Sequence, residues 1–142
     1  MPLDRILIAL QKRFEEEPYA RMFAIKIAAL EEGRSVLEMR TTPQMDNLLS
    51  MTHGAAIYSL VDAAFELAVN SHGTVAVAIS VNVNYINAPK VGELLRAEGR
   101  EVNASRRIAA CDVTVTGEDG RLIATCQALA YRKNEMLPFL HP

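Results

Sequence analysis

The chain has 142 residues, of which 50% are hydrophobic and 23% are charged, a composition typical of a globular protein and not of a disordered one. This length predicts a single domain spanning residues 1–142. The 15 basic and 17 acidic residues give a formal net charge of −2, so the charge gives no reason to expect a nucleic-acid partner.

The chain begins with a predicted short helix over residues 1–17, which is amphipathic and is closed by Pro18. This segment lacks the apolar centre and the small-residue cleavage site of a secretory signal. The longest apolar segment, 55–69, is too short to span a bilayer and is interrupted by polar residues. We therefore expect a soluble, cytoplasmic protein with no membrane partner.

Residues 24–133 are predicted to form the core of the fold. A hairpin of two strands, 24–31 and 34–41, comes first, with a Gly at its turn, and the loop 42–52 follows it. One long helix, apolar on nearly all sides, is then predicted from about residue 54 to residue 71 and ends before a glycine.

Residues 74–86, TVAVAISVNVNYI, carry the strongest strand signal in the chain. Large side chains, mostly valines, alternate with smaller ones that run from Ala76 through Ser80 to Asn84. This alternation predicts that the long helix lies close against the face formed by the small residues.

Three further strands complete the predicted fold, at residues 94–102, 106–116 and 121–132. Cys111 and Cys126 lie inside two of them and are predicted to be buried free thiols, since two isolated cysteines make no metal-ligand pattern. A run of strands around one central helix indicates an α+β protein with an antiparallel sheet. The outer face of that sheet still needs a cover, and a second copy of the chain would supply one, so a homo-oligomer is predicted.

Asp62 is the most informative residue, because it lies in the middle of the apolar helix. Asp is a poor residue for a helix interior, and burying its carboxylate costs several kcal/mol unless the group is paired. One interpretation is therefore a functional site. The alternative is a thin solvent-exposed stripe that Asp62 shares with Ser59 and Glu66, which lie before and after it at helical spacing.

The start of this helix carries a second group of polar residues, with Asn47 in the preceding loop and His53-Gly54 at the first turn. Backbone N–H groups of a first turn are unsatisfied and can hold a carbonyl oxygen as it becomes an oxyanion, and a glycine there lets a ligand approach closely. Asp62 lies about 12 Å further along the axis, at about 1.5 Å per residue. A site that combines Gly54 with Asp62 therefore indicates two subunits.

Each candidate also has a purely structural interpretation. Asn47 can be a turn residue, His53 a helix cap, Ser80 a small residue on a small strand face and Glu66 a solvated charge. The basic residues Arg106, Arg107 and Lys133 could reach phosphate groups or could be solvated surface.

Taken in order, Asn47, His53-Gly54, Asp62, Ser80 and the segment 88–93, APKVGE, resemble the hotdog-fold acyl-CoA thioesterases of the PaaI type, also called the 4-hydroxybenzoyl-CoA thioesterase superfamily. The resemblance covers about residues 24–133. Two features depart from the family pattern: Ala55 replaces a second glycine, and Leu48-Leu49 replace a glycine in the preceding loop. These changes concern how closely a bulky acyl group can pass the start of the helix.

The resemblance implies a curved antiparallel sheet wrapped around the central helix, with active sites between subunits of a dimer or, commonly, of a homotetramer built from two dimers. Asp62 would act as general base or nucleophile, and the Gly54 N–H of the opposite subunit would polarise the thioester carbonyl. Asn47 and His53 would orient the carbonyl and the helix start, and Ser80 would position a water molecule.

The predicted function is hydrolysis of small or medium acyl-CoA or arylacyl-CoA thioesters to the free acid and CoA, with no cofactor or metal. The alternative is a non-catalytic acyl-CoA-binding or regulatory domain of the same fold. Arg106 and Arg107 are candidates for the CoA phosphates. The acyl pocket is predicted to be lined by Leu48, Leu49, Met51, Ile57, Tyr58 and Val61.

Overall fold

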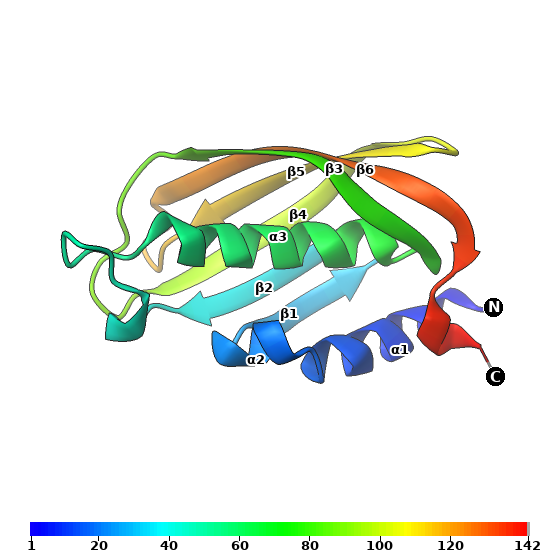
Figure 1. Cartoon of the computed structure of the whole chain (residues 1–142), viewed down its shortest axis with the longest axis horizontal. Coiled ribbons are helices and arrows are strands. Elements are labelled where there is room, and N and C mark those ends of the chain that lie inside the picture. Colours follow the sequence, from blue (N-terminus) through cyan, green and yellow to red (C-terminus); the bar gives the residue numbers. More distant parts are fainter. Residues whose placement is uncertain (142) are drawn as a thin grey trace.

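The computed structural model describes residues 1–141 and contains three α-helices, six strands and two short 3-10 turns (Figure 1). The helices are α1 (Leu3–Glu15), α2 (Pro18–Met22) and α3 (Gly54–Asn70). The strands are β1 (Lys26–Glu31), β2 (Arg34–Arg40), β3 (Thr74–Tyr85), β4 (Leu94–Ala104), β5 (Ile108–Thr116) and β6 (Leu122–Met136). The 3-10 turns are η1 (Pro43–Met45) and η2 (Pro138–Leu140).

The six strands form one antiparallel sheet in the order β1-β2-β4-β5-β6-β3, which curves around α3 (Figure 1). This arrangement confirms the predicted α+β hotdog fold. Strand β3 is an edge strand that pairs only with β6. The free edge of β3 exposes backbone groups that another strand can pair with.

The core lies between the concave face of the sheet and α3, most of whose side chains are buried. The helix approaches the sheet closely at Gly99, where a Cβ atom would come within 2.8 Å of the Ala64 carbonyl oxygen. The Ser35 hydroxyl donates to the same oxygen at 2.6 Å. Cys111 and Cys126 are buried free thiols, as predicted, and burial raises their pKa to about 12 and about 11.

The structure differs from the sequence prediction at Pro18, which was expected to end the N-terminal helix. The first helix ends at Glu15, and Pro18 begins the additional helix α2, since the first turn of a helix is the position that tolerates proline best. Helix α2 ends at Met22, and Ala24, just beyond its C-cap, has a left-handed φ of 51°. The first strand therefore begins at Lys26 and not at residue 24.

The prediction that the small residues of β3 face α3 holds only for the first part of the strand, because the register with β6 shifts between Ala78 and Ser80. Ala78 pairs with the buried Ala130, on the side of α3, whereas Ser80 pairs with Leu129, which is 39% exposed on the opposite face. Residues that pair directly across strands share a face. A bulge inserts one residue and reverses the alternation, so the valines beyond it point toward α3 and the small polar residues point away.

Candidate active site

The start of α3 presents a free backbone donor. His53 is the N-cap, and its Nδ1 accepts the Ala55 N–H at 3.0 Å. The Gly54 N–H has no hydrogen-bond acceptor within residues 1–141. The Tyr85 ring lies against Gly54, and a Cβ atom on this residue would be 3.2 Å from the ring Cζ. The geometry therefore leaves one N–H at the positive end of a 17-residue helix for a ligand oxygen.

The loop before α3 is shaped by Asn47. Its Oδ1 accepts the N–H groups of Leu49 at 2.8 Å and Met51 at 3.1 Å. Ser50 completes the turn with a left-handed φ of 59°. The turn interpretation of Asn47 is therefore correct, and it leaves the side-chain NH₂ of this residue as the group that can donate to a substrate carbonyl.

Asp62 lines two cavities on one side of α3, in the middle of the helix. The smaller, of about 130 Å³, is also lined by Tyr58 and Ser59. The larger, of about 440 Å³, is also lined by Phe65 and Ala78. Partial burial raises the pKa of the Asp62 carboxyl. The Asp62 carboxylate is thus partly buried. It is neither sealed in the core nor free on a solvent-exposed stripe, the two environments that the sequence left open.

The separation of Asp62 from Gly54 follows from the helix itself. Both residues belong to the uninterrupted α3, and eight residues of α-helix extend about 12 Å. Gly54 and Asp62 of one chain therefore cannot act on the same carbonyl group. This agrees with the prediction from the sequence.

This arrangement of fold and polar groups matches known proteins. The sequence profile of the Thioesterase superfamily matches residues 49–124. An Archaeoglobus fulgidus protein named "Putative esterase" is 35% identical over 125 residues, covering 88% of this chain and 81% of that protein. The chain belongs to the thioesterase superfamily. The resemblance to the PaaI type is confirmed as well: acyl-coenzyme A thioesterase PaaI of Escherichia coli is 27% identical over 119 residues, covering 84% of this chain and 85% of that protein.

Solved structures share the fold of this chain. The E. coli PaaI protein superposes with a TM-score of 0.90 at 24% identity, over 95% of this chain and 99% of that chain. A Streptococcus mutans protein, solved bound to acetyl CoA, superposes with a TM-score of 0.76 at 25% identity, over 80% of this chain and 91% of that chain.

The sequence interpretation missed the role of the α1–α2 corner in this thioesterase-superfamily chain. Glu17 and Tyr19, from the corner, line both cavities beside Asp62. The Tyr19 hydroxyl lies 2.9 Å from Ser59 Oγ. Because the Ser59 hydroxyl already donates to the Ala55 carbonyl oxygen at 2.8 Å, the Tyr19 hydroxyl is the donor of this pair. No motif marks such residues, which come close to Asp62 only through the fold.

The expectation that Glu66 is a solvated charge is wrong. Burial, the negative charge of Glu17, a hydrogen bond with the Glu17 side chain and the charge of Asp62 together raise the pKa of Glu66 to about 8. Burial and the neighbouring negative charge thus favour the protonated form of the Glu66 carboxyl, which can donate a hydrogen bond to its neighbour.

We expect Glu66→Gln to raise the melting temperature at about pH 9 and to leave it nearly unchanged at about pH 5. At pH values between the usual carboxyl pKa of 4.5 and the folded-state pKa of Glu66 of about 8, the native state binds more protons than the unfolded chain. The stability from this group is thus complete below the unfolded pKa and is lost as the pH rises through about 8. Glutamine resembles the protonated form, so the gain at high pH should exceed about 3 °C.

Thermal unfolding followed by circular dichroism across this pH range measures the effect. Glu16→Gln, at an exposed carboxylate of the same corner, is the matched control and should show no comparable rise at high pH. An equal shift in melting temperature of the Glu66→Gln variant at both pH values would contradict the raised pKa of Glu66.

Other predicted site residues are not brought together in one chain. Leu48 and Leu49 are 95% and 67% exposed, and Ile57 and Val61 are buried in the core. A single subunit therefore does not assemble the predicted acyl pocket, and of its predicted lining only Tyr58 shares a cavity with Asp62. A pocket completed by a second subunit stays a prediction.

Ser80 lies on the face of the sheet away from α3, where its Oγ accepts a hydrogen bond from Asn82 Nδ2 at 3.1 Å. Its predicted role as a water-positioning residue beside Asp62 is therefore not supported within one chain, and it stays a prediction. Ala55, in place of the family's second glycine, has an ordinary helical backbone, because its φ is not among the positive values of the chain.

Arg106 and Arg107 lie in the turn between β4 and β5. Figure 1 shows this turn at the end of the sheet opposite to the start of α3. The Arg107 guanidinium lies 6.0 Å from the centre of the Tyr131 ring and donates to its hydroxyl at 2.8 Å. The predicted role of Arg106 and Arg107 in binding the CoA phosphates stays a prediction.

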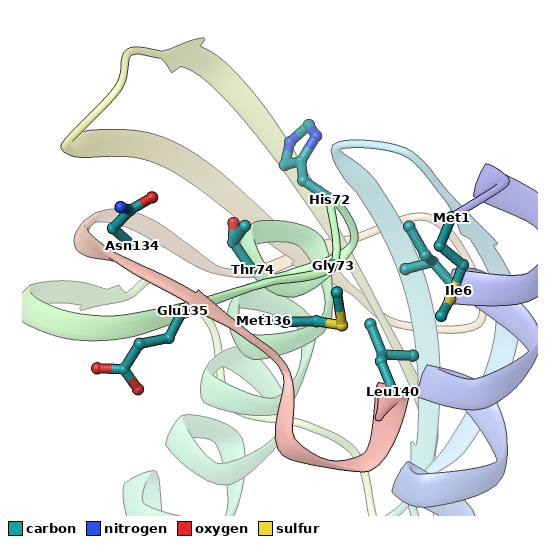
Figure 2. Close-up of a pocket in the computed structure, with 9 residues that line it drawn as sticks. All are labelled: Met1, Ile6, His72, Gly73, Thr74, Asn134, Glu135, Met136 and Leu140. Carbon is teal, nitrogen blue, oxygen red and sulfur yellow. The ribbon is translucent and has the colours of Figure 1, made fainter. Parts of the chain in front are cut away.

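A separate cavity of about 320 Å³ lies beyond the C-terminal end of α3 (Figure 2). Figure 2 shows His72 at its rim and Met1, Ile6 and Leu140 on its other side. The His72 ring bridges two carboxylates, Glu32 at 3.0 Å and Glu101 at 2.7 Å, so its pKa is raised, chiefly by the hydrogen bond to Glu101.

Glu101 also accepts a hydrogen bond from Arg132 at 2.8 Å. These ion pairs tie the β1–β2 hairpin to β4 and β6, and they lie at the opposite end of α3 from the free Gly54 N–H.

In the described part of the chain, no helix is both long and apolar enough to cross a membrane.

Proposed function

We propose that the chain is an acyl-CoA thioesterase that hydrolyses small or medium acyl-CoA or arylacyl-CoA thioesters to the free acid and CoA. The observation that carries the proposal is the pairing, on one helix, of a free N–H at Gly54 with a half-buried carboxylate at Asp62. The first can hold a developing oxyanion and the second can activate water or attack the carbonyl.

The chemistry needs few parts. In one route Asp62 takes a proton from water, and the hydroxide forms a C–O bond to the thioester carbonyl. The resulting oxyanion accepts a hydrogen bond from Gly54 N–H, and the C–S bond then breaks. In the other route the Asp62 carboxylate attacks directly, and water hydrolyses the mixed anhydride. The leaving thiol has a pKa near about 8.5 and departs as thiolate, so no strong general acid, cofactor or metal is required.

Partial burial of Asp62 supports either route, because a carboxylate with a raised pKa is a stronger base than an exposed one. His53 supports the helix start by capping Ala55, and the Asn47 amide supplies a second donor for the carbonyl. The S. mutans relative, solved bound to acetyl CoA, supports a CoA thioester as the substrate.

The proposed active unit is a homo-oligomer in which Gly54 of one subunit meets Asp62 of another. Two features support this: the distance between the two groups along α3, and the apolar side chains Leu48 and Leu49 that one chain leaves in solvent beside the helix start. The edge strand β3 adds exposed Val77 and Ile79 on a free backbone edge. A dimer of dimers and a cytoplasmic location are further predictions of the same proposal.

The test is thiol release from a panel of acetyl-, hexanoyl-, lauroyl-, phenylacetyl- and hydroxybenzoyl-CoA. Turnover of any member, lost when Asp62 is replaced, supports the thioesterase and identifies its substrate class. Binding of the CoA esters without turnover of any member would reject hydrolysis in favour of a non-catalytic acyl-CoA-binding domain.

A further inference from the structure

One side of α3 is not covered by the sheet of its own chain. Twelve of the 17 residues of this helix are buried, and the five that are exposed or half-buried are Gly54, Ala55, Tyr58, Asp62 and Glu66. Residues 54, 58, 62 and 66 recur at a spacing of four, so they form one inclined row on the helix surface, here called the α3 row. A partner that reaches Asp62 must therefore approach along this row.

Two features of the α3 row leave room for a partner surface. Its largest side chain, Tyr58, is 38% exposed. The free edge of β3 borders the row, because Ala76 and Ala78 of this strand line the same cavity as Asp62. The row and the strand edge can therefore be covered by one and the same partner.

Two-fold symmetry determines which residues of the α3 row meet. When Gly54 of one subunit meets Asp62 of another, every contact of the symmetric dimer occurs twice, so Asp62 of the first subunit also meets the partner's Gly54. Two straight helices satisfy both contacts only when they run antiparallel. The residue midway between positions 54 and 62 then faces its own copy, and that residue is Tyr58.

The charges of the α3 row favour the antiparallel arrangement. The first turn of α3 carries a partial positive charge and the free Gly54 N–H, whereas Asp62 carries a carboxyl group. Antiparallel helices place each Asp62 at the positive end of the partner's α3. Parallel helices would instead set Asp62 against its own copy, and two carboxylates that share a partly buried space repel each other.

We propose that the α3 row is a contact surface between two copies of this chain, with Tyr58 on the two-fold axis and its ring against the partner's Tyr58. The inference rests on the proposed function and deepens it, because the two rings then separate the two active sites of the dimer. Each ring lies four residues, or about 6 Å along the helix, from Asp62 of its own chain. Tyr58 already lines the smaller cavity beside Asp62 within one chain.

Cross-linking at position 58 tests this contact. Tyr58→Cys places two thiols on the axis, where facing Cα atoms of packed helices come within the about 7 Å that a disulfide spans. The chain also carries Cys126→Ala, because the Cys126 thiol lies near Tyr58. We expect mild oxidation to convert more than about half of the chains to a covalent dimer on a non-reducing gel. Cys126→Ala alone should stay monomeric on that gel, since the remaining Cys111 is buried.

Glu66→Cys in the same background is the matched control, because it lies on the same row eight positions from Tyr58. In the antiparallel dimer the two copies of residue 66 are about 24 Å apart, too far for a disulfide. Parallel helices would bring every position of the row to its own copy. Equal cross-linking of both variants therefore overturns the inference. So does a Tyr58→Cys chain that is cross-linked neither by oxidation nor by a short bismaleimide.

A second probe needs no cysteine at position 58. The photoreactive residue p-benzoylphenylalanine in place of Tyr58 keeps an aromatic ring at this exposed position. Irradiation should join it to the partner's α3, which mass spectrometry detects as a peptide of α3 linked to a second copy of itself. Such a product forms only between two chains. Attachment to any other element of the partner overturns the place of Tyr58 on the axis.

The cross-link does not depend on hydrolysis, so the two proposals fail separately. A specific covalent dimer of a chain that hydrolyses no acyl-CoA would uphold the Tyr58 contact and reject the thioesterase. Hydrolysis by a chain that gives no cross-link at position 58, with either probe, would uphold the thioesterase and overturn the Tyr58 contact.

Discussion

Asp62→Asn is expected to lose on the order of a hundredfold or more of kcat for every thioester that the chain hydrolyses. The substitution keeps the size of the side chain and removes the charge that accepts the proton of water or attacks the carbonyl. Burial already disfavours the ionised carboxylate, as its raised pKa indicates, so the neutral amide should leave the fold as stable as before or slightly more so. Thiol release together with a thermal melt measures both effects.

Asp112→Asn is the matched control, because it makes the same chemical change at an exposed position on β5. It should keep full activity. Near-full activity of Asp62→Asn would remove Asp62 from the chemistry and would leave the two cavities as binding space only. A lower melting temperature together with lost activity would instead assign Asp62 a structural role.

The fold was largely predictable from local patterns. The apolar segment from residue 54 onward is long enough to be a helix, and large β-branched residues alternate with smaller ones in the segments after it. Together these segments indicated a sheet around one helix, which the structure has. The position of Asp62 in that helix was informative for the same reason: its neighbours are so apolar that only one stripe of α3 could be left for a polar group. The free N–H at the helix start also follows from sequence, since every helix has unsatisfied donors there.

What the sequence did not predict depends on contacts between distant segments. Proline is common both after a helix and in the first turn of one, so Pro18 gave no sign that α2 begins there and brings Tyr19 to Ser59, 40 residues along the chain. The bulge that turns Ser80 away from α3 lies in a run whose alternation looks regular, because nothing in the residue types marks where a strand gains its extra residue. The raised pKa of Glu66 likewise requires the approach of Glu17.

Gly54→Pro is expected to reduce kcat by about a hundredfold or more, because it removes the backbone N–H that is aimed at the oxyanion. The fold should tolerate it. Gly54 is the first residue of α3, where proline is accepted, and His53 already has the extended backbone that a following proline requires, with φ −64° and ψ 137°. Gly54→Ala is the matched control: it adds a Cβ atom against Tyr85 yet keeps the N–H, so most of its activity should remain.

Gly54→Pro and Asp62→Asn, when combined in one dimer, decide whether each active site is shared between two subunits. If each site takes its N–H from one subunit and its carboxylate from another, a dimer of one Gly54→Pro chain and one Asp62→Asn chain contains one intact site and one doubly altered site. Random pairing makes about half of the dimers mixed, so co-expression of the two inactive chains should restore about a quarter of the original activity. If both groups acted within one chain, every site in the mixture would carry one defect and no activity would return. The separation of Gly54 and Asp62 by eight positions along α3 favours the first result, because a rigid helix cannot fold back to bring its own first turn to its middle.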